Sequence, residues 1–255
     1  MVLTADEIRN FDARGARVCR SLASPYYSCY FEFIGPNDEL SDAAFPKYVY
    51  RYLDHEQYAD DLVTRGTLKL GSLLKYRDRE AYGDTRHDEK EGQAGFLSKL
   101  DGGLFNGFPY QYSAISQDCW VLCTSLSCSN EVAKRFQSDF CVRITLRPFA
   151  IALAGAMAQR SDVGGAGIVR YSVYAGGENV VSSSRAKPAF ARMHKRSTYL
   201  AEKELRIWFE SRAHRDTSRE VELRGRNPSG KPTNVEPSLL TCSDLSRFCK
   251  RVSIH

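Results

Sequence analysis

Apolar and polar side chains alternate along several stretches of this chain, a pattern typical of β-strands with one buried face. In the clearest stretch, from Tyr199 to Phe209, the side chains of Leu205, Ile207 and Phe209 share one face. The opposite face carries Glu202, Glu204, Arg206 and Trp208. The other predicted strands are residues 26–34, 48–52, 67–74, 119–126, 139–146, 168–174 and 221–224.

Short stretches with a helical apolar period separate some of these strands. Asp54 is a predicted N-cap for a helix that ends at Arg65, because Gly66 stands where a left-handed C-cap belongs. Further short helices are predicted at residues 4–22, 130–136, 148–160 and from 243 onward. Since only residues 46–74 read as strand, helix, strand, a repeating parallel α/β fold is disfavoured. The pattern predicts an α+β fold with mixed, mostly antiparallel sheets and short helices.

Length and composition indicate one main domain. The chain has 255 residues, of which 42% are hydrophobic and 26% charged, as in ordinary globular proteins. Residues 1–45 are predicted to form an accessory helix and strand, and residues 46–255 a single α+β domain of catalytic type. The eight cysteines include no Cys-x-x-Cys pair, so we expect mostly free thiols.

Charge and hydropathy restrict the expected location and ligands. The net charge of +5 permits an anionic ligand without requiring one. No run approaches the roughly 18 apolar residues of a membrane helix, and the N-terminus lacks the features of a signal peptide. We therefore expect a cytoplasmic protein without membrane contact, or an exported effector with no visible signal.

The main candidate site combines polar residues from three separate predicted strands. Arg51 lies on the first strand, Thr124 and Ser125 lie near the end of a buried strand, and Glu202 and Glu204 lie on the late charged face. In this order the chain resembles the Arg–Ser–Glu class of ADP-ribosyltransferases, with its Glu-x-Glu strand. The sequence Leu-Gly-Ser-Leu-Leu-Lys-Tyr-Arg at residues 70–77 is also similar to uncharacterised bacterial proteins, and that likeness implies no activity.

The transferase resemblance covers residues 46–210 and implies an ADP-ribosyltransferase-like split-sheet core. NAD would be the substrate, and ADP-ribose would pass to an unknown protein or nucleic acid. Glu204 would stabilise the oxocarbenium-like transition state, and Glu202 would orient or deprotonate the acceptor. Ser125 would hold Glu204 and the ribose. Arg51 would bind the pyrophosphate, because its planar fork matches phosphate oxygens.

The remaining predicted ligand contacts are Tyr52, Thr124, Tyr76 and Arg77. A tyrosine ring such as that of Tyr52 or Tyr76 would stack on nicotinamide, and Arg77 would touch the nucleotide if the charged loop of residues 75–92 closed over it. We expect no metal in this reaction. An inhibitor protein is a further expected partner if the enzyme serves as a toxin or in defence.

Each of these residues also has a structural interpretation. Arg51 lies between two tyrosines and is typical of a surface arginine over aromatic rings, while Ser125 is typical of a strand-end serine bonded to backbone. Glu204 would pair with Arg206 on the same strand face. If Arg206 folds back onto Glu204, the strand has a structural role.

Two further charged stretches suggest different functions. An acidic loop would bind a divalent metal in a nuclease-like centre through Asp84, His87, Asp88, Glu89 and Glu91. A basic run would make the protein a non-enzymatic nucleic-acid or partner-binding module through Lys187, Arg192, His194, Lys195 and Arg196.

Overall fold

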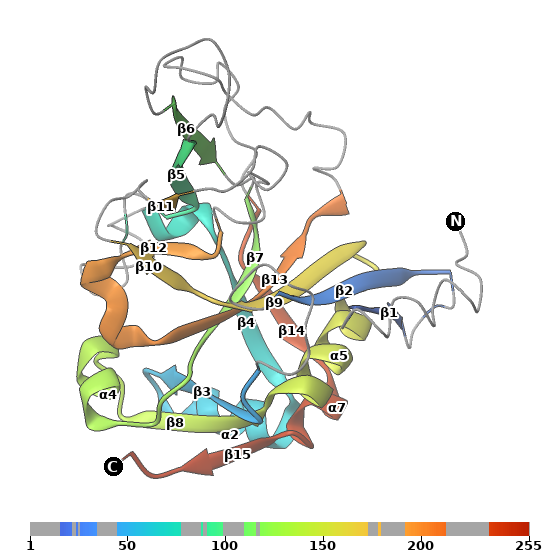
Figure 1. Cartoon of the computed structure of the whole chain (residues 1–255). Coiled ribbons are helices and arrows are strands. Elements are labelled where there is room, and N and C mark those ends of the chain that lie inside the picture. Colours follow the sequence, from blue (N-terminus) through green and yellow to red (C-terminus); the bar gives the residue numbers. More distant parts are fainter. Residues whose placement is uncertain are drawn as a thin grey trace.

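Ten strands form one large sheet in the computed structural model (Figure 1). Eight of them follow the path β1 (Ala16–Arg20), β2 (Ser28–Ile34), β9 (Val163–Ile168), β13 (Glu204–Glu210), β7 (Cys119–Ser125), β3 (Tyr48–Leu53), β8 (Phe140–Thr145) and β15 (Cys249–Val252). Beside this path, β4 (Thr67–Ser72) pairs with β7 and with β14 (Ser238–Thr241). The structure describes residues 16–21, 24, 26–34, 45–77, 88, 91–98, 110–115, 118–172, 178–179, 192–212 and 235–254.

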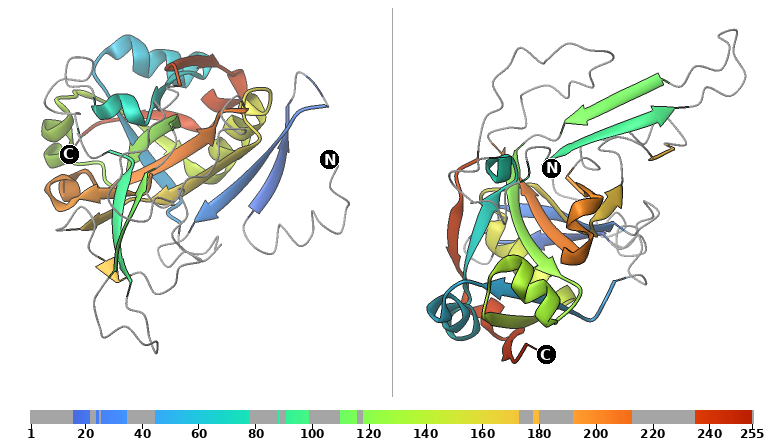
Figure 2. Two further views of the ribbon diagram at one scale, coloured as in Figure 1. Left: turned by 90° about the horizontal axis from the view of Figure 1, so that it is seen from above. Right: turned by 90° about the vertical axis from the view of Figure 1, so that its left-hand side faces the viewer.

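Two smaller sheets and six short helices complete the described elements. One small sheet contains β10 (Arg170–Ser172) and β12 (His194–Arg196), and the other contains β11 (Glu178–Asn179), β5 (Gln93–Ser98) and β6 (Tyr110–Ile115). Figure 2 shows β5 and β6 extending as a hairpin beyond the large sheet. The helices are α2 (Glu56–Arg65), α4 (Asn130–Phe136), α5 (Leu146–Met157), α7 (Ser243–Ser246) and the 3-10 helices η1 (Leu74–Arg77) and η3 (Ser197–Glu202).

The predicted fold class is confirmed in its general form. Most neighbouring strands of the large sheet are antiparallel, whereas β2 and β9 are parallel, so the sheet is mixed. All eight cysteines are free thiols, as expected. In the part of the chain that is described, no helix is long and apolar enough to cross a membrane.

The two faces of β13 separate the hydrophobic core from the polar side of the sheet. Leu205, Ile207 and Phe209 are fully buried in the main core, which α5 also enters through Phe149 and Leu153. The opposite face of the strand carries Glu204, Arg206 and Trp208. The period-two pattern therefore predicts the faces of this strand correctly, and its charged face is buried as well.

The strand β13 begins later than the sequence predicts. Residues 199–202 belong to η3, and Lys203 then adopts a left-handed conformation with φ of 45°. Glu202 is consequently the last residue of a 3-10 helix and does not lie on the strand with Glu204. The alternation pattern does not predict the break between η3 and β13. The left-handed Lys203 interrupts the strand without changing the order of apolar and polar residues.

A glycine-rich strand was also missed, because the prediction placed a strand at residues 168–174. Beside β7, the second neighbour of β13 is β9, with the sequence Val-Gly-Gly-Ala-Gly-Ile. A Cβ atom at Gly164 would lie 2.6 Å from the Phe209 ring, and one at Gly165 would lie 2.6 Å from the Trp208 ring. These glycines let large side chains of β13 cover the neighbouring strand, and they leave no apolar period for a sequence pattern to detect.

The N-terminal segment differs from its prediction where it is described. Residues 16–20 form the strand β1, which pairs with β2, so the helix predicted at residues 4–22 does not extend through them. Strand β2 joins the large sheet through β9. The division at residue 45 stays a prediction, and the strand predicted at 221–224 lies outside the described residues.

The large sheet is split along one edge of β7. Near the start of β7, Val121 pairs with Gly71 of β4, and at its end Ser125 pairs with Tyr50 of β3. The described registers leave residues 122–124 without a strand partner on this edge. In Figure 1, β3, β8 and β15 lie at the bottom of the molecule, whereas β9 and β13 cross its middle.

Replacing Gly165 with alanine should lower the free energy of unfolding by about 1–3 kcal/mol, because overpacking is destabilising. The new Cβ would lie 2.6 Å from the Trp208 ring and 3.0 Å from the Glu32 carbonyl oxygen. Gly155→Ala is the control, since its Cβ meets only the Arg20 carbonyl oxygen at 3.1 Å and alanine favours the helix α5. Urea denaturation measures both, and an unchanged midpoint for Gly165→Ala would contradict this packing.

Candidate functional site

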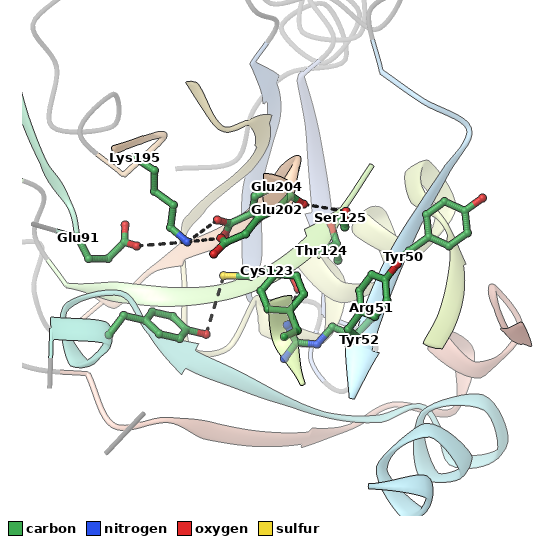
Figure 3. Close-up of a pocket in the computed structure, with 12 residues that line it drawn as sticks. Tyr50, Arg51, Tyr52, Glu91, Cys123, Thr124, Ser125, Lys195, Glu202 and Glu204 are labelled. Carbon is green, nitrogen blue, oxygen red and sulfur yellow. Dashed lines mark hydrogen bonds and ion pairs between the residues drawn. The ribbon is translucent and has the colours of Figure 1, made fainter. Parts of the chain in front are cut away.

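One pocket lies where the strands β3, β7 and β13 meet (Figure 3). It encloses about 580 Å³ of empty space, counting its open mouth. The side chains that line it belong to Tyr50, Arg51, Tyr52, Tyr76, Glu91, Cys123, Thr124, Ser125, Phe136, Lys195, Glu202 and Glu204. Seven of the eight predicted site residues therefore line one pocket, and Arg77 is the exception.

Strand pairing brings together residues that are far apart in the sequence. In the antiparallel pair of β13 and β7, Glu204 lies opposite Ser125 and Arg206 lies opposite Cys123. On the other edge of β7, Ser125 lies opposite Tyr50, the neighbour of Arg51. The middle strand thus joins the arginine-bearing strand to the glutamate-bearing strand.

The hydroxyl groups of β7 bind backbone rather than the carboxylates. Ser125 Oγ donates a hydrogen bond to the carbonyl oxygen of Glu202 at 2.8 Å and accepts one from the Ser127 amide at 3.2 Å. Thr124 Oγ1 donates to the Leu205 carbonyl oxygen at 2.9 Å. Both hydroxyls therefore hold the junction of η3 and β13, from which Glu202 and Glu204 project. The predicted contact of Ser125 with the side chain of Glu204 is not formed.

Arg51 occupies the gap in the split sheet. Its Nη1 donates a hydrogen bond to the carbonyl oxygen of Cys123, a residue without a strand partner on that edge in the described registers. The neighbouring Tyr52 hydroxyl accepts a bond from the Ser129 amide at 2.8 Å and lies 3.0 Å from the Ser127 carbonyl oxygen. Its ring packs against Phe136, 5.7 Å away between centroids. This packing fixes the ring at the wall of the pocket.

Tyr76 lies in the pocket, but Arg77 does not. The Tyr76 hydroxyl is 3.9 Å from Cys123 Sγ, and its ring covers Gly71, where a Cβ would meet the hydroxyl at 2.8 Å. The helix η1 that carries both residues is held by Asp118, which accepts bonds from the Leu74 amide at 2.9 Å and from Ser72 Oγ at 2.7 Å. Arg77 instead donates from Nε to the Glu91 carbonyl oxygen at 2.6 Å.

The ammonium group of Lys195 bridges the two candidate catalytic carboxylates. Lys195 Nζ lies 2.8 Å from Glu202 Oε2 and 2.9 Å from Glu204 Oε2. Figure 3 shows both carboxylates turned toward this ammonium group. From α4, Arg135 Nε approaches Glu202 Oε1 to 3.7 Å. Glu202 and Glu204 are only 2% and 1% exposed, so these cations replace most of their hydration.

Arg206 folds back onto Glu204, as the structural interpretation of the sequence anticipates. Its Nε donates to Glu204 Oε1 at 2.8 Å, while Nη1 and Nη2 donate to Glu91 Oε1 and Oε2 at 2.6 and 2.8 Å. The last two bonds form a bidentate pair, the strong geometry for an arginine and a carboxylate. Glu204 nevertheless still lines the pocket.

The two carboxylates have pKa values shifted in opposite directions. Burial alone would raise the pKa of Glu204, but the positive charges of Arg206 and Lys195 hold it well below its usual range. Burial raises the pKa of Glu202, and the attraction of Lys195 only partly opposes this because the charge of Glu204 adds to it. The directions of the two shifts therefore favour Glu204 as the ionised carboxylate and Glu202 as the better proton acceptor.

The sequence pattern does not predict that Lys195 and Glu91 line this pocket. It indicates a basic run for Lys195 and an acidic loop for Glu91. Their partners lie on β13, η3 and β12, so the pairing depends on the tertiary fold. Arg206 was the available signal, because an arginine inside a strand with apolar neighbours needs a buried anion.

Three described residues of the basic run form ion pairs within the fold. Arg192 pairs with Glu210 at 3.0 Å and lies 4.3 Å from the centroid of the Trp208 ring. Arg196 pairs with Asp88 at 2.9 Å. Lys195 and Arg192 are buried in ion pairs, whereas Arg196 keeps 33% of its side chain exposed. The nucleic-acid-binding alternative stays a prediction. Lys187 lies outside the described residues.

The acidic loop is described only at two of its candidate positions. Asp88 pairs with Arg196, and Glu91 pairs with Arg206. Asp84, His87 and Glu89 lie outside the described residues. Within the described ranges, no three His, Cys, Asp or Glu side chains are grouped so as to hold a metal ion.

The pocket has a cluster of carboxylates near one wall and an arginine at another. The carboxylates of the cluster belong to Glu91, Glu202 and Glu204, and its buried cations to Lys195 and Arg206. The partly exposed Arg135 is a third cation on this cluster, and Arg51 supplies a separate positive charge from β3. No family model, curated protein or solved structure matches the chain. This charge arrangement is consequently the basis for inferring a ligand.

Replacing Arg206 with methionine should lower the free energy of unfolding by about 3–5 kcal/mol, because two buried carboxylates lose their partner. Arg251→Met is the matched control, since Arg251 pairs with Glu56 and Asp60 on the surface. That substitution should change stability little, because solvent screens exposed ion pairs. Guanidinium denaturation at pH 7 compares the two variants. Equal, small losses would contradict a tightly coupled buried network around Arg206.

Proposed function

We propose that this protein is an NAD-dependent ADP-ribosyltransferase-like enzyme that transfers ADP-ribose from NAD to a protein or nucleic-acid acceptor. The observation that carries the proposal is the direct pairing of β13, β7 and β3 around one pocket. These strands bring the side chains of Glu204, Ser125 and Arg51 to its walls. The chain order of the three residues and the split along β7 agree with the core that the sequence resemblance implies.

The charges of the pocket suit NAD. In this molecule a cationic nicotinamide ring is joined to a ribose, and an anionic pyrophosphate follows. The carboxylate cluster would attract the cationic ring, and Arg51 would bind the pyrophosphate through the remaining N–H groups of its fork. The aromatic rings of Tyr52 and Tyr76 line the same pocket and would contact the nicotinamide.

A second pocket adjoins the first and would take the rest of a dinucleotide. It shares Arg51, Tyr52 and Phe136 with the first pocket and encloses about 1880 Å³ of empty space, counting its mouth. Tyr58 and Phe149 are among its other lining residues. A ligand with its pyrophosphate at Arg51 would therefore extend its adenosine end into this second pocket.

In the proposed reaction, the bond between nicotinamide and ribose C1′ breaks, and its electron pair leaves with the ring, which becomes neutral. Positive charge then develops on C1′ and the ring oxygen of the ribose. Glu204 stays ionised and would stabilise that charge electrostatically. The acceptor attacks C1′ and gives its proton to Glu202, whose raised pKa suits a general base.

Ser125 would act through the backbone rather than on the ribose. Its bond to the Glu202 carbonyl holds the turn from which both carboxylates extend. Thr124 would do the same through its bond to Leu205. Both residues would therefore position the carboxylates without touching the substrate.

Purified protein should release nicotinamide from NAD, and Glu204→Gln should lower kcat by roughly 10²–10³-fold, the range for losing one preorganised electrostatic group. Glu210→Gln is the matched control, because Glu210 lies on the same strand and pairs with Arg192 outside the pocket. Chromatography of the products measures release, and thermal unfolding monitors the fold. Equal release by Glu204→Gln and the wild type would remove Glu204 from the mechanism.

Arg51→Met should raise KM for NAD by roughly ten- to a hundred-fold, since a hydrogen bond to a charged group contributes about 1.5–3 kcal/mol. Arg143→Met is the control: this arginine lies on the adjacent strand β8 and stacks on the Tyr48 ring at 4.5 Å. Initial rates across NAD concentrations separate KM from kcat. An unchanged KM in Arg51→Met would place the pyrophosphate elsewhere.

A further inference from the structure

The strand β12 contributes a lysine that the resemblance to transferases does not include. Lys195 is 10% exposed and contacts three carboxylates, those of Glu202, Glu204 and, at 3.9 Å, Glu91. Burial alone would lower the pKa of Lys195, but these carboxylates raise it well above its usual value. The lysine is therefore a fixed positive charge inside the pocket.

We infer that Lys195 is a positioning residue that holds Glu202 beside Glu204 and keeps Glu202 available as a base. The geometric part of this inference is independent of any reaction, whereas its catalytic part rests on the proposed function. Both Oε2 atoms bind the same Nζ, so the two oxygens cannot lie farther apart than these two short contacts together allow. Two carboxylates that share one ammonium group raise each other's pKa, and the positive charge between them opposes that rise.

The two carboxylates depend on Lys195 to different degrees. Glu204 has a second strong partner in Arg206, 2.8 Å away. Glu202 has only the more distant Arg135 as an additional cation among the described residues, at 3.7 Å and from a partly exposed position. Removal of the ammonium would therefore leave Glu204 ionised and drive a proton onto Glu202. A protonated Glu202 cannot accept the proton of an acceptor nucleophile.

Lys203 stands between the two glutamates in the sequence but has a different place. It is exposed and makes the left-handed turn between η3 and β13. The turn brings the two carboxylates onto one ammonium group from another strand. Lys195 rather than Lys203 is therefore the lysine that neutralises the pair.

Other titratable and charged groups surround this cluster, and none of them is changed in the variants compared below. The Tyr171 hydroxyl accepts a hydrogen bond from the Glu204 amide at 2.8 Å, and the Tyr199 ring lies 5.0 Å from Lys195 Nζ. Among the described residues, the charged and titratable groups near the pair include Tyr76, Asp88, Glu91, Cys123, Arg135, Tyr171, Arg196, Tyr199 and Arg206.

The kinetic test compares Lys195→Met, Lys195→Arg and the control Lys203→Met over a range of pH. Loss of the ammonium should lower kcat for ADP-ribose transfer to an acceptor by roughly 10²-fold or more at neutral pH, the range for general base catalysis. The rate should recover as the pH rises, because the acidic limb of the profile moves upward with Glu202. Lys195→Arg should restore most of the rate, and Lys203→Met should match the wild type. A loss that is equal at every pH, or no rescue by arginine in a folded variant, would show a merely structural lysine.

A second readout needs no enzymatic activity. Carbon NMR of protein labelled at its glutamate carboxyls follows the titration of Glu202, assigned with Glu202→Gln. The Glu202 midpoint should move to higher pH in Lys195→Met and stay in place in Lys203→Met. An unmoved midpoint overturns the inference even if NAD is turned over, while a moved midpoint supports the geometric part even if NAD is not a substrate.

Stability provides the decisive comparison if Lys195→Met folds poorly. The double variant Lys195→Met with Glu202→Gln removes the cation together with the carboxylate that depends on it. It should unfold at a higher denaturant concentration than Lys195→Met alone, because no uncompensated carboxylate stays buried. Equal or lower stability of the double variant would contradict the role of Lys195.

Discussion

The pocket depends on the buried guanidinium group of Arg206, which joins Glu204 on its own strand to Glu91 from a distant segment. Burying such charges is costly unless every member keeps its partners. Lys195 extends the same network to Glu202, and Arg196 ties Asp88 down beside it. The strand β13, the helix η3 and the described residues Asp88 and Glu91 are therefore held together by these ion pairs. The aromatic rings of Tyr52 and Phe136 pack against each other at the pocket wall and add apolar contacts to this network.

Local patterns in the sequence predict the central strands well. Tyr48–Leu53, Cys119–Ser125 and the later part of Tyr199–Phe209 all form strands, and Gly66 ends α2 with φ of 65°, as predicted. Each of these elements has a local apolar period or cap. The strand β9 has neither, because glycines occupy the positions on which the rings of Phe209 and Trp208 pack. Strand order and register depend on contacts between distant segments, so no local pattern contains them.

The candidate site shows the same division between local and long-range information. The convergence of Arg51, Ser125 and Glu204 at one pocket is expected from the chain order that resembles the transferases, whereas their strands alone predict only which face each side chain occupies. The structural interpretation correctly predicts that Ser125 binds backbone and that Arg206 pairs with Glu204. The pattern does not predict which carbonyl Ser125 binds or that Arg77 lies outside the pocket. Glu91 belongs to a stretch of mixed charge that reads as a solvated loop, yet the fold buries it against Arg206. A charge pattern alone does not distinguish an ion pair in solvent from one in the core.

The pairing of Glu204 with Arg206 is compatible with a catalytic role as well as a structural one. A carboxylate that is to stabilise a developing positive charge must stay ionised when buried, and burial alone would protonate it. Arg206 and Lys195 supply the compensation that keeps Glu204 negative. Arg135 and Lys195 pair with Glu202 in the same way, so three cations face the three carboxylates of this network. Both Glu202 and Glu204 still face an open pocket, so their ion pairs do not close the site.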